Sequence, residues 1–203
     1  MTEQEYPKDF FLPDEEIGSS FIYRMAILIF YNFFGPFYDV EMVGLDKLPP
    51  KGTGGLMVSM HTTHCKDIYT FGTMFFLKTG RALRGMMHRS LYYVPIIKPL
   101  MTSIGMLPGS RELGSELCRR GYMVGCFPGG AREAMTGHEN AYKLQWGKRR
   151  GFAHVAKNGG VKIYPFFATN EEEMRFNPLF WLANLFRLRS EEHTSELQSR
   201  QYL

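Results

Sequence analysis

Short apolar runs, each followed by a polar cluster or a helical pattern, are the feature that most limits how this chain can fold. Runs of six or seven residues predict strands, and the segments with helical periodicity between them predict helices. This alternation predicts a layered α/β domain, with a mixed, mainly parallel sheet flanked by helices. The expected strands are residues 39–45, 55–61, 82–88, 122–127 and 161–167, and the expected helices are residues 65–78, 94–104, 111–119 and 142–157.

Composition and charge narrow the class of protein. The 203 residues are 44% hydrophobic and 15% aromatic, which is enough apolar material for one folded domain. The net charge of +4 is mild and fits an anionic membrane surface or an anionic cofactor better than a nucleic-acid groove, so no nucleic-acid partner is expected. The three cysteines form no CxxC pair, which indicates reduced thiols in an intracellular protein. The first ten residues lack the pattern of a secretory signal.

Two aromatic segments lie near the ends of the chain. Residues 25–34 form an apolar run about half as long as the roughly 20 residues that span a bilayer. Their aromatic side chains predict a helix that lies in a membrane interface, although a core helix would have the same pattern. Residues 177–189 form a second aromatic segment of the same kind. Asn177 and Pro178 are expected to begin a helix there, and arginines lie at its end.

The composition changes abruptly at the end of the chain. The stretch "RSEEHTSELQS" resembles one reading frame of a common sequencing-adapter oligonucleotide, so residues 190–203 are interpreted as an artefactual tail. His193 and Ser195 are therefore left out of the candidate sites. The expected organisation is an N-terminal segment with the aromatic helix (1–38), a C-terminally truncated main domain (39–189) and this tail.

Three polar clusters follow the apolar runs "GLMVSMH", "IGML" and "YMVGCF". They are "HTTHCKD" (61–67), "PGSRE" (108–112) and "PGGARE" (128–133). In open α/β sheets, ligands bind outside the carboxyl ends of the strands. We therefore expect the three clusters to line one pocket.

The first cluster allows several kinds of chemistry. His61, His64, Cys65 and Asp67 are possible metal ligands, but their spacing matches no common zinc site, so no metal is expected. Cys65, between His64 and Lys66, is a possible nucleophile, although no known signature supports it. A structural polar turn is a further alternative. The favoured interpretation is a histidine general base, His61, oriented by Asp67, because neutral imidazole can take a proton from a hydroxyl near pH 7.

These residues also match the pattern of a known family. "HTTHCKD", "GMLPGSRE", "FPGGAREA" and "VKIYPFF" resemble, in order and spacing, the four sequence blocks of the phospholipid/glycerol acyltransferase superfamily. The third block, extended through "WGKRRGFAHVAKNGG", resembles most the diacylglycerol-acyltransferase-like branch and its subgroup of the transmembrane protein sixty-eight type. The resemblance covers residues from about 40 to 175 and implies the glycerolipid acyltransferase-like fold for the main domain.

The resemblance implies a function and a set of site residues. The activity would be transfer of a fatty acyl group from acyl-CoA, as co-substrate, to a glycerolipid hydroxyl at the endoplasmic reticulum membrane. No metal or prosthetic group is implied. His61 would be the base and Asp67 its orienting acid, while residues 68–80 and the N-terminal aromatic helix would line an acyl channel. The substrate-binding residues would be Arg111, Gly129, Gly130, Arg132 and Glu133. The two arginines could instead form surface salt bridges with no contact to substrate. The two glycines could instead be present only because the chain makes a tight turn there.

Two departures from the family pattern bear on the substrate. His61 and Asp67 have five residues between them instead of four, a spacing that the subgroup shares and that leaves His64 as a rival base. The usual Phe-Pro-Glu-Gly-Thr-Arg block has Gly129 in place of its glutamate, and the acidic residue is Glu133. This change favours a neutral acceptor, mono- or diacylglycerol, and hence triacylglycerol synthesis. A lysophospholipid or glycerophosphate acyltransferase, a non-catalytic lipid-binding module and a metallohydrolase are the alternatives.

Overall fold

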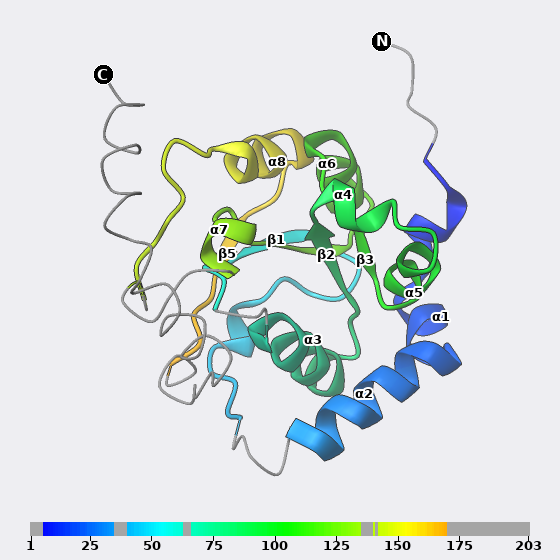
Figure 1. The fold of residues 1–203 in the computed structure, drawn as a ribbon. Helices are drawn as coiled ribbons and strands as arrows, with labels where there is room; N and C mark the ends of the chain where they lie inside the picture. Colours follow the sequence, from blue (N-terminus) through cyan, green and yellow to red (C-terminus); the bar gives the residue numbers. More distant parts are fainter. Residues whose placement is uncertain (1–5, 35–39, 63–65, 135–139, 141, 170–203) are drawn as a thin grey trace, which may run out of the picture.

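A five-stranded parallel sheet forms the centre of the molecule (Figure 1). The computed structural model describes residues 6–34, 40–62, 66–134, 140 and 142–169. In the sheet the strands have the order β3-β2-β4-β1-β5, and every pairing among them is parallel. The strands are β1 (Gly55–Val58), β2 (Leu83–Met87), β3 (Met106–Pro108), β4 (Met123–Cys126) and β5 (Ile163–Pro165).

Four of the five predicted strands are confirmed in shorter form, as β1, β2, β4 and β5. The prediction for 39–45 is wrong over the described part: residues 40–44 form no strand and Leu45–Lys47 is a 3-10 turn, η3. Met42, Leu45 and Leu48 instead pack, at three-residue spacing, against the core below the sheet. The apolar residues of this segment therefore belong to the core, although the segment is not a strand of the sheet. The fifth strand is β3, which contains part of the short run before "PGSRE".

The helices surround the sheet on both faces. They are α1 (Asp14–Ser19), α2 (Phe21–Phe34), α3 (Lys66–Thr79), α4 (Arg89–Tyr92), α5 (Ile97–Ser103), α6 (Arg111–Arg119), α7 (Ala131–Ala134) and α8 (Gly151–Gly159), with a 3-10 turn η1 (Lys8–Phe11) before them.

The predicted helix 111–119 is confirmed as α6. It begins where predicted because the Ser110 hydroxyl accepts a hydrogen bond from the Leu113 N–H, 3.0 Å away, and so caps the helix.

The prediction for 142–157 is wrong before Gly151, because Tyr142 (φ 59°) and Gly147 (φ 53°) have left-handed backbones that a helix cannot contain. The helix predicted at 94–104 is shorter, as α5, and residues 177–189 lie outside the described residues.

Alternate residues of β1 point to two different cores. Leu56 and Val58 pack with Leu113, Leu117 and Val155 of α6 and α8. Met57 packs with Phe75 of α3, together with Leu83 and Met123. Helices α6 and α8 therefore cover one face of the sheet and α3 covers the other, as Figure 1 shows. This is the α/β layering expected from the alternation of strand and helix patterns.

The N-terminal segment is attached to the sheet by the buried Arg84 of β2. Its guanidinium donates hydrogen bonds to the carbonyls of Leu12 and Ala82 and lies 3.2 Å from the Asp14 carboxylate. Tyr122 extends the attachment through a hydrogen bond to the Phe11 carbonyl. Burial raises the pKa of Asp14 and lowers the pKa of Arg84, because each charge has lost most of its water.

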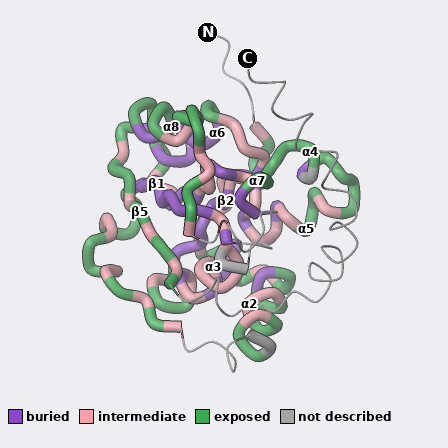
Figure 2. The backbone as a smooth tube through the Cα atoms, turned by 60° about the vertical axis from the view of Figure 1, so that its left-hand side comes forward, coloured by how far each residue is buried: buried purple, intermediate pink, exposed green. Residues whose placement is uncertain are grey.

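The aromatic helix α2 is packed on one side and exposed on the other. Tyr23 packs edge-to-face on Phe76 of α3, and Phe30 stacks on Tyr69 with ring centroids 4.8 Å apart. Large apolar side chains on the outer side remain exposed, among them Phe21 (77%) and Ile29 (54%), and Figure 2 shows α2 with exposed positions at the edge of the molecule. Among the residues that the structure describes, no helix is both long and apolar enough to cross a bilayer.

Candidate active site

His61 lies three residues beyond the end of β1, next to the segment that follows β4. Its imidazole stacks on the Phe127 ring with centroids 4.2 Å apart and planes at 13°. Phe127 contacts Phe166 edge-to-face, and Phe166 stacks on Phe71 of α3 with centroids 4.0 Å apart. A row of aromatic rings therefore connects His61 to both α3 and the end of β5. This row fixes the plane of the imidazole from one side.

The partners expected for His61 are not all described. Asp67 is the second residue of α3, so its backbone begins the helix that follows the histidine segment, as the sequence predicts. The Asp67 side chain, His64 and Cys65 lie outside the described residues, so the His61–Asp67 pair, its rival base, the alternative nucleophile and the alternative metal ligands stay predictions. Within the described part of the chain, no three His, Cys, Asp or Glu side chains could share a metal ion.

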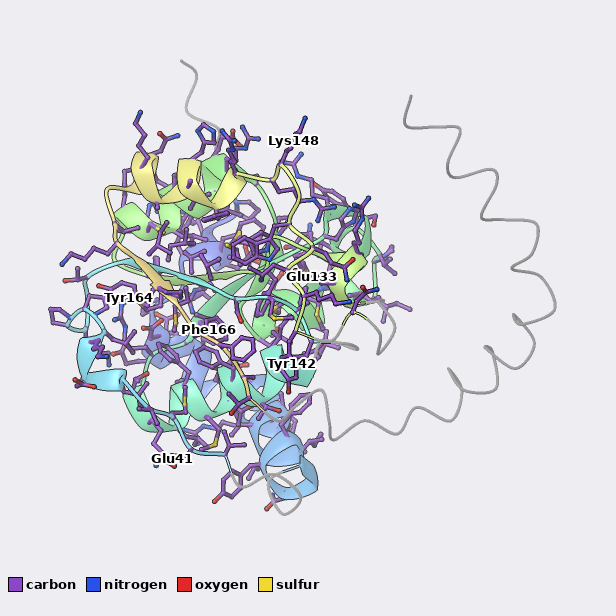
Figure 3. All side chains as sticks on the ribbon, turned by 90° about the vertical axis from the view of Figure 1, so that its left-hand side faces the viewer. Glu41, Glu133, Tyr142, Lys148, Tyr164 and Phe166 are labelled. Atoms are coloured by element: carbon purple, nitrogen blue, oxygen red, sulfur yellow. The ribbon has the colours of Figure 1, made fainter. Side chains whose placement is uncertain are left out.

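Glu133 makes a contact to the His61 segment that the sequence did not indicate. One carboxylate oxygen accepts a hydrogen bond from the His61 backbone N–H at 2.9 Å, and the other accepts one from the Gln145 N–H at 2.8 Å. The side chain is only 1% exposed, although Glu133 lies on the short helix α7 on the face shown in Figure 3. The first and third polar clusters are therefore in direct contact.

The "PGG" turn before α7 is held by an arginine from "GKRRG". Arg149 donates to the carbonyls of Pro128, at 2.9 Å, and Gly129. Gly130 has a left-handed backbone (φ 55°), and its N–H donates to the Phe127 carbonyl, which closes the turn. Gly129 and Gly130 thus adopt the tight turn considered for them, while contact of either with substrate remains a prediction.

Arg111 and Arg132 are both exposed. Arg111 is the first residue of α6 and lies beside Gly151 at the start of α8. The second cluster is attached to the end of β2, where the Gly109 N–H donates to the Met87 carbonyl and the Arg89 guanidinium to the Gly109 carbonyl. In the strand order, β2 and β4 lie between β3, which leads into this cluster, and β1, which leads to His61.

A small apolar pocket of about 60 Å³ lies between α2, α3 and the lower face of the sheet, and its wall includes Phe127. The sequence predicted that α2 and residues 68–80 line an acyl channel, and both contribute to this pocket. Its lining is Tyr23, Ala26, Ile27, Phe30, Ile68, Tyr69, Gly72, Thr73, Leu83, Gly85, Ile104, Met106 and Phe127.

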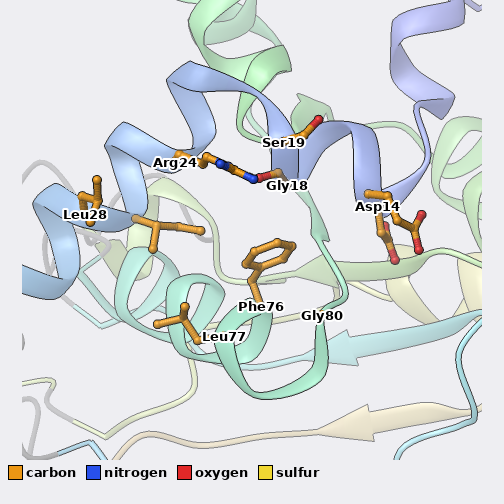
Figure 4. Close-up of a pocket in the computed structure, with 10 residues that line it drawn as sticks. Asp14, Gly18, Ser19, Arg24, Leu28, Phe76, Leu77 and Gly80 are labelled. Carbon is orange, nitrogen blue, oxygen red and sulfur yellow. The ribbon is translucent and has the colours of Figure 1, made fainter.

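A second, larger hollow of about 470 Å³ lies farther along the same two helices (Figure 4). Its wall combines apolar Leu28, Phe76 and Leu77 with the charged residues Asp14 and Arg24. It does not include Phe127 or His61, so we do not assign it to the candidate site.

Two of the three cysteines are excluded as nucleophiles at neutral pH. Burial raises the pKa of both Cys118 and Cys126 to about 12, so neither thiol ionises near pH 7. Cys126 is the residue before Phe127, so its thiol is close to the candidate site but stays protonated at neutral pH.

Comparison with known proteins places this geometry in a family. The model of the acyltransferase family matches residues 39–169. The human protein "DGAT1/2-independent enzyme synthesizing storage lipids" is 34% identical over 136 residues, which are 67% of this chain and 41% of that protein. The Arabidopsis thaliana protein "1-acyl-sn-glycerol-3-phosphate acyltransferase LPAT1, chloroplastic" is 29% identical over 140 residues, 64% of this chain and 36% of its own length.

A third relative, "Phytyl ester synthase 1, chloroplastic" from Arabidopsis thaliana, is 29% identical over 153 residues, which are 70% of this chain and 21% of that protein. No solved structure matches significantly. The chain spans less than half the length of these relatives. The family match covers the strand ends, His61 and the third polar cluster together, and it shows that this chain belongs to the acyltransferase family.

Proposed function

We propose that this chain is an acyl-CoA-dependent O-acyltransferase that moves a fatty acyl group to a glycerolipid hydroxyl, with mono- or diacylglycerol as the acceptor. The observation that carries the proposal is the position of His61 beyond the carboxyl end of β1, with its ring stacked on Phe127, a residue that also lines the apolar pocket. The name of the human relative, which refers to storage lipids, supports a neutral glycerolipid product.

The proposed reaction needs one base and no acyl-enzyme. His61 takes the proton of the acceptor hydroxyl while the oxygen attacks the carbonyl carbon of the thioester. The new C–O bond forms, the C–S bond breaks, and coenzyme A leaves as the thiol after it receives the proton from the imidazolium. Asp67 would hold the imidazole in the correct tautomer and stabilise its charged form. The "PGGARE" turn would stabilise the oxyanion or position the substrate. General-base catalysis of this kind contributes a rate factor of about 10²–10⁴.

The apolar pocket is proposed to receive the fatty acyl chain. Its lining contains no charged side chain and includes Phe127, the residue on which the His61 ring stacks. At about 60 Å³ it is too small for a long chain as it stands. Helices α2 and α3 would therefore have to move apart when the acyl chain binds.

The exposed apolar side of α2 is proposed to rest on a membrane surface. Exposed patches of large apolar side chains usually mark protein or membrane contacts, and this helix borders the proposed acyl pocket. Contact there would let the acyl chain and the acceptor enter from lipid. The endoplasmic reticulum is the proposed membrane, on the family resemblance alone.

Incorporation of labelled fatty acid tests this function. The chain and its His61→Ala and His64→Ala variants would be expressed in cells that lack triacylglycerol synthesis, and label would be followed into each lipid class. The proposal predicts label in triacylglycerol with the wild type and His64→Ala, and none above background with His61→Ala. Incorporation that is indifferent to His61 would leave a non-catalytic lipid-binding module as the better interpretation.

A second candidate is acylation of a phosphate-bearing acceptor. Two observations favour it: the exposed cations Arg111 and Arg132 follow the second and third clusters, and the Arabidopsis thaliana relative is named for such an acceptor. In the same cells this activity would put label into phosphatidic acid or phospholipid, and Arg111→Ala or Arg132→Ala would abolish that label.

A further inference from the structure

The Glu133 carboxylate is buried, and burial of a charged group costs free energy because the group loses its water. Its side chain is 1% exposed, and a buried carboxylate is tolerated only when hydrogen bonds replace its lost water. Both oxygens have such partners in the backbone N–H groups of His61 and Gln145. Hydrogen bonds to an ionised acceptor are roughly twice as strong as neutral ones. The carboxylate therefore connects two segments that are distant in sequence.

The bond to His61 continues the ladder between β1 and β4 at the point where the ladder ends. The Gly55 N–H donates to the Tyr122 carbonyl, and the Ser59 N–H donates to the Cys126 carbonyl. Because ladder bonds in a parallel pair recur every two residues, the next acceptor for His61 would be the Pro128 carbonyl. That carbonyl accepts from Arg149 instead, and the chain turns away. A Glu133 oxygen takes its place at 2.9 Å from the His61 nitrogen.

Gly129 provides the space that this carboxylate occupies. A Cβ atom at position 129 would lie 1.9 Å from Glu133 Cδ and 2.1 Å from Oε2, far closer than two such atoms can approach. Gly129 is not among the glycines with a left-handed backbone. The reason for a glycine here is therefore the volume above its Cα atom and not its backbone conformation.

We propose that Glu133 is a positioning residue for His61, and that Gly129 is the glycine that makes this possible. The carboxylate fixes the main chain of His61 while Phe127 fixes the plane of its ring. This inference rests on the proposed function of His61 as the base and replaces a substrate contact as the role of Glu133. Loss of the carboxylate would leave substrate binding in place and misplace the base.

Glu133→Gln tests the inference with little change in shape. A glutamine has one accepting oxygen, so one of the two backbone N–H groups would face an NH₂ group and lose its bond. With oleoyl-CoA and dioleoylglycerol in vesicles, kcat is expected to fall by about 10²-fold, as for other small misplacements of catalytic groups, while KM stays within about twofold. Hydrogen exchange of the His61 amide, followed by NMR, is expected to accelerate.

Two controls separate positioning from loss of stability. Glu116→Gln makes the same chemical change in a carboxylate that accepts hydrogen bonds from Arg119 of α6 and from Arg120 at the end of that helix. Leu117→Ala opens a cavity in the core between α6 and the sheet, so it lowers the melting temperature without changing Glu133 or Gly129. Assayed below their melting temperatures, both controls are expected to keep the wild-type kcat and the protection of the His61 amide.

Gly129→Ala provides an independent test through the opposite partner. Its methyl group would expel the Glu133 carboxylate, so it should reproduce both effects of Glu133→Gln. The double variant should be no worse than the more impaired single variant, because both changes remove one contact. Glu133→Gln and Gly129→Ala proteins that both keep the wild-type kcat and a protected His61 amide would overturn the inference. A different outcome would separate the two proposals. If hydrogen exchange of the His61 amide accelerates in the variants but the wild type itself transfers no acyl group, the proposed function is wrong while the Glu133–His61 contact is confirmed.

Discussion

The chemistry of this molecule depends on a few side chains whose roles are set by their neighbours. Glu133 and Gly129 illustrate this at the scale of single residues: the carboxylate of one fills the space that the missing side chain of the other leaves empty. Neither residue has a special role by its type alone. The main-chain N–H of the candidate base, His61, donates a hydrogen bond to that carboxylate.

Asp14 has an environment that predicts an unusual dependence of stability on pH. Burial raises its pKa, and this effect outweighs the attraction of Arg84 and Arg81. Between the ordinary aspartate value of about 3.9 and the higher pKa of the folded protein, the folded state binds more protons than the unfolded state. The contribution of Asp14 to stability is therefore complete below about pH 3.9 and is lost as the pH rises through the folded pKa.

Asp14→Asn removes this titration. The difference in free energy of unfolding between the wild type and Asp14→Asn should fall as the pH is raised from about 3 to 6, as measured by urea denaturation at several pH values. A difference that grows with pH would mean that the attraction of Arg84 outweighs burial.

At the scale of elements, α3 carries a position that is suited to probing the acyl pocket. Gly72 lines the pocket, and a Cβ atom there would meet no other atom within 4 Å. Replacement of a glycine inside a helix by a better helix former stabilises by up to about 1 kcal/mol. Gly72→Leu is therefore expected to fold at least as well as the wild type while it narrows the pocket.

The expected result of Gly72→Leu is a change in chain-length preference. KM for oleoyl-CoA should rise about tenfold, corresponding to 1.4 kcal/mol of lost binding, while KM for a short-chain acyl-CoA changes little. Equal effects on long and short chains would show that this pocket does not receive the acyl group.

Helix α2 is the element proposed to contact lipid. Phe21 (77% exposed) and Ile29 (54%) lie on its outer side and do not line the apolar pocket. Changing both to serine is expected to reduce the fraction of protein that sediments with phospholipid vesicles and to leave activity on detergent-dispersed substrates unchanged. Val43→Ser is the matched control, because Val43 is 86% exposed but lies outside this helix. Equal sedimentation of all three proteins would contradict the assignment.

The elements that the sequence predicted are those whose signals are local. Helix α6 begins at a serine cap, and nearly all residues of β1, β2 and β4 are buried. The apolar runs and the capping serine in the sequence therefore coincide with elements of the structure. The strand predicted at residues 39–45 was wrong over its described part because the apolar residues there pack as an irregular segment. The helix predicted at residues 142–157 was wrong before Gly151 because the positive φ angles at Tyr142 and Gly147 leave few traces in the sequence.

The candidate site could be predicted only in part for a similar reason. His61 and the "PGGARE" cluster were found because they follow apolar runs. The contacts of Glu133 with His61 and Gln145 join residues 72 and 12 positions apart, and the stacking of Phe127 on His61 joins the segments that follow β4 and β1. Such contacts depend on the strand order, which the sequence pattern did not specify.

At the scale of the whole molecule, the order β3-β2-β4-β1-β5 determines which clusters meet. It puts the ends of β1 and β4 side by side, so that His61 reaches the third cluster. The same sheet separates the core under α6 and α8 from the core that faces α3 and the apolar pocket. The candidate base therefore lies beyond the carboxyl end of β1, where the third cluster meets it.

The role of His61 is measured by the rate of coenzyme A release from oleoyl-CoA by the purified chain, with dioleoylglycerol in vesicles as the acceptor. Wild type, His61→Ala and His64→Ala would be compared at equal folded concentration. If His61 is the general base, His61→Ala lowers kcat by about 10²–10⁴ with little change in KM, and His64→Ala stays near the wild type. A His61→Ala protein that releases coenzyme A at the wild-type rate would contradict the central claim that His61 is the base.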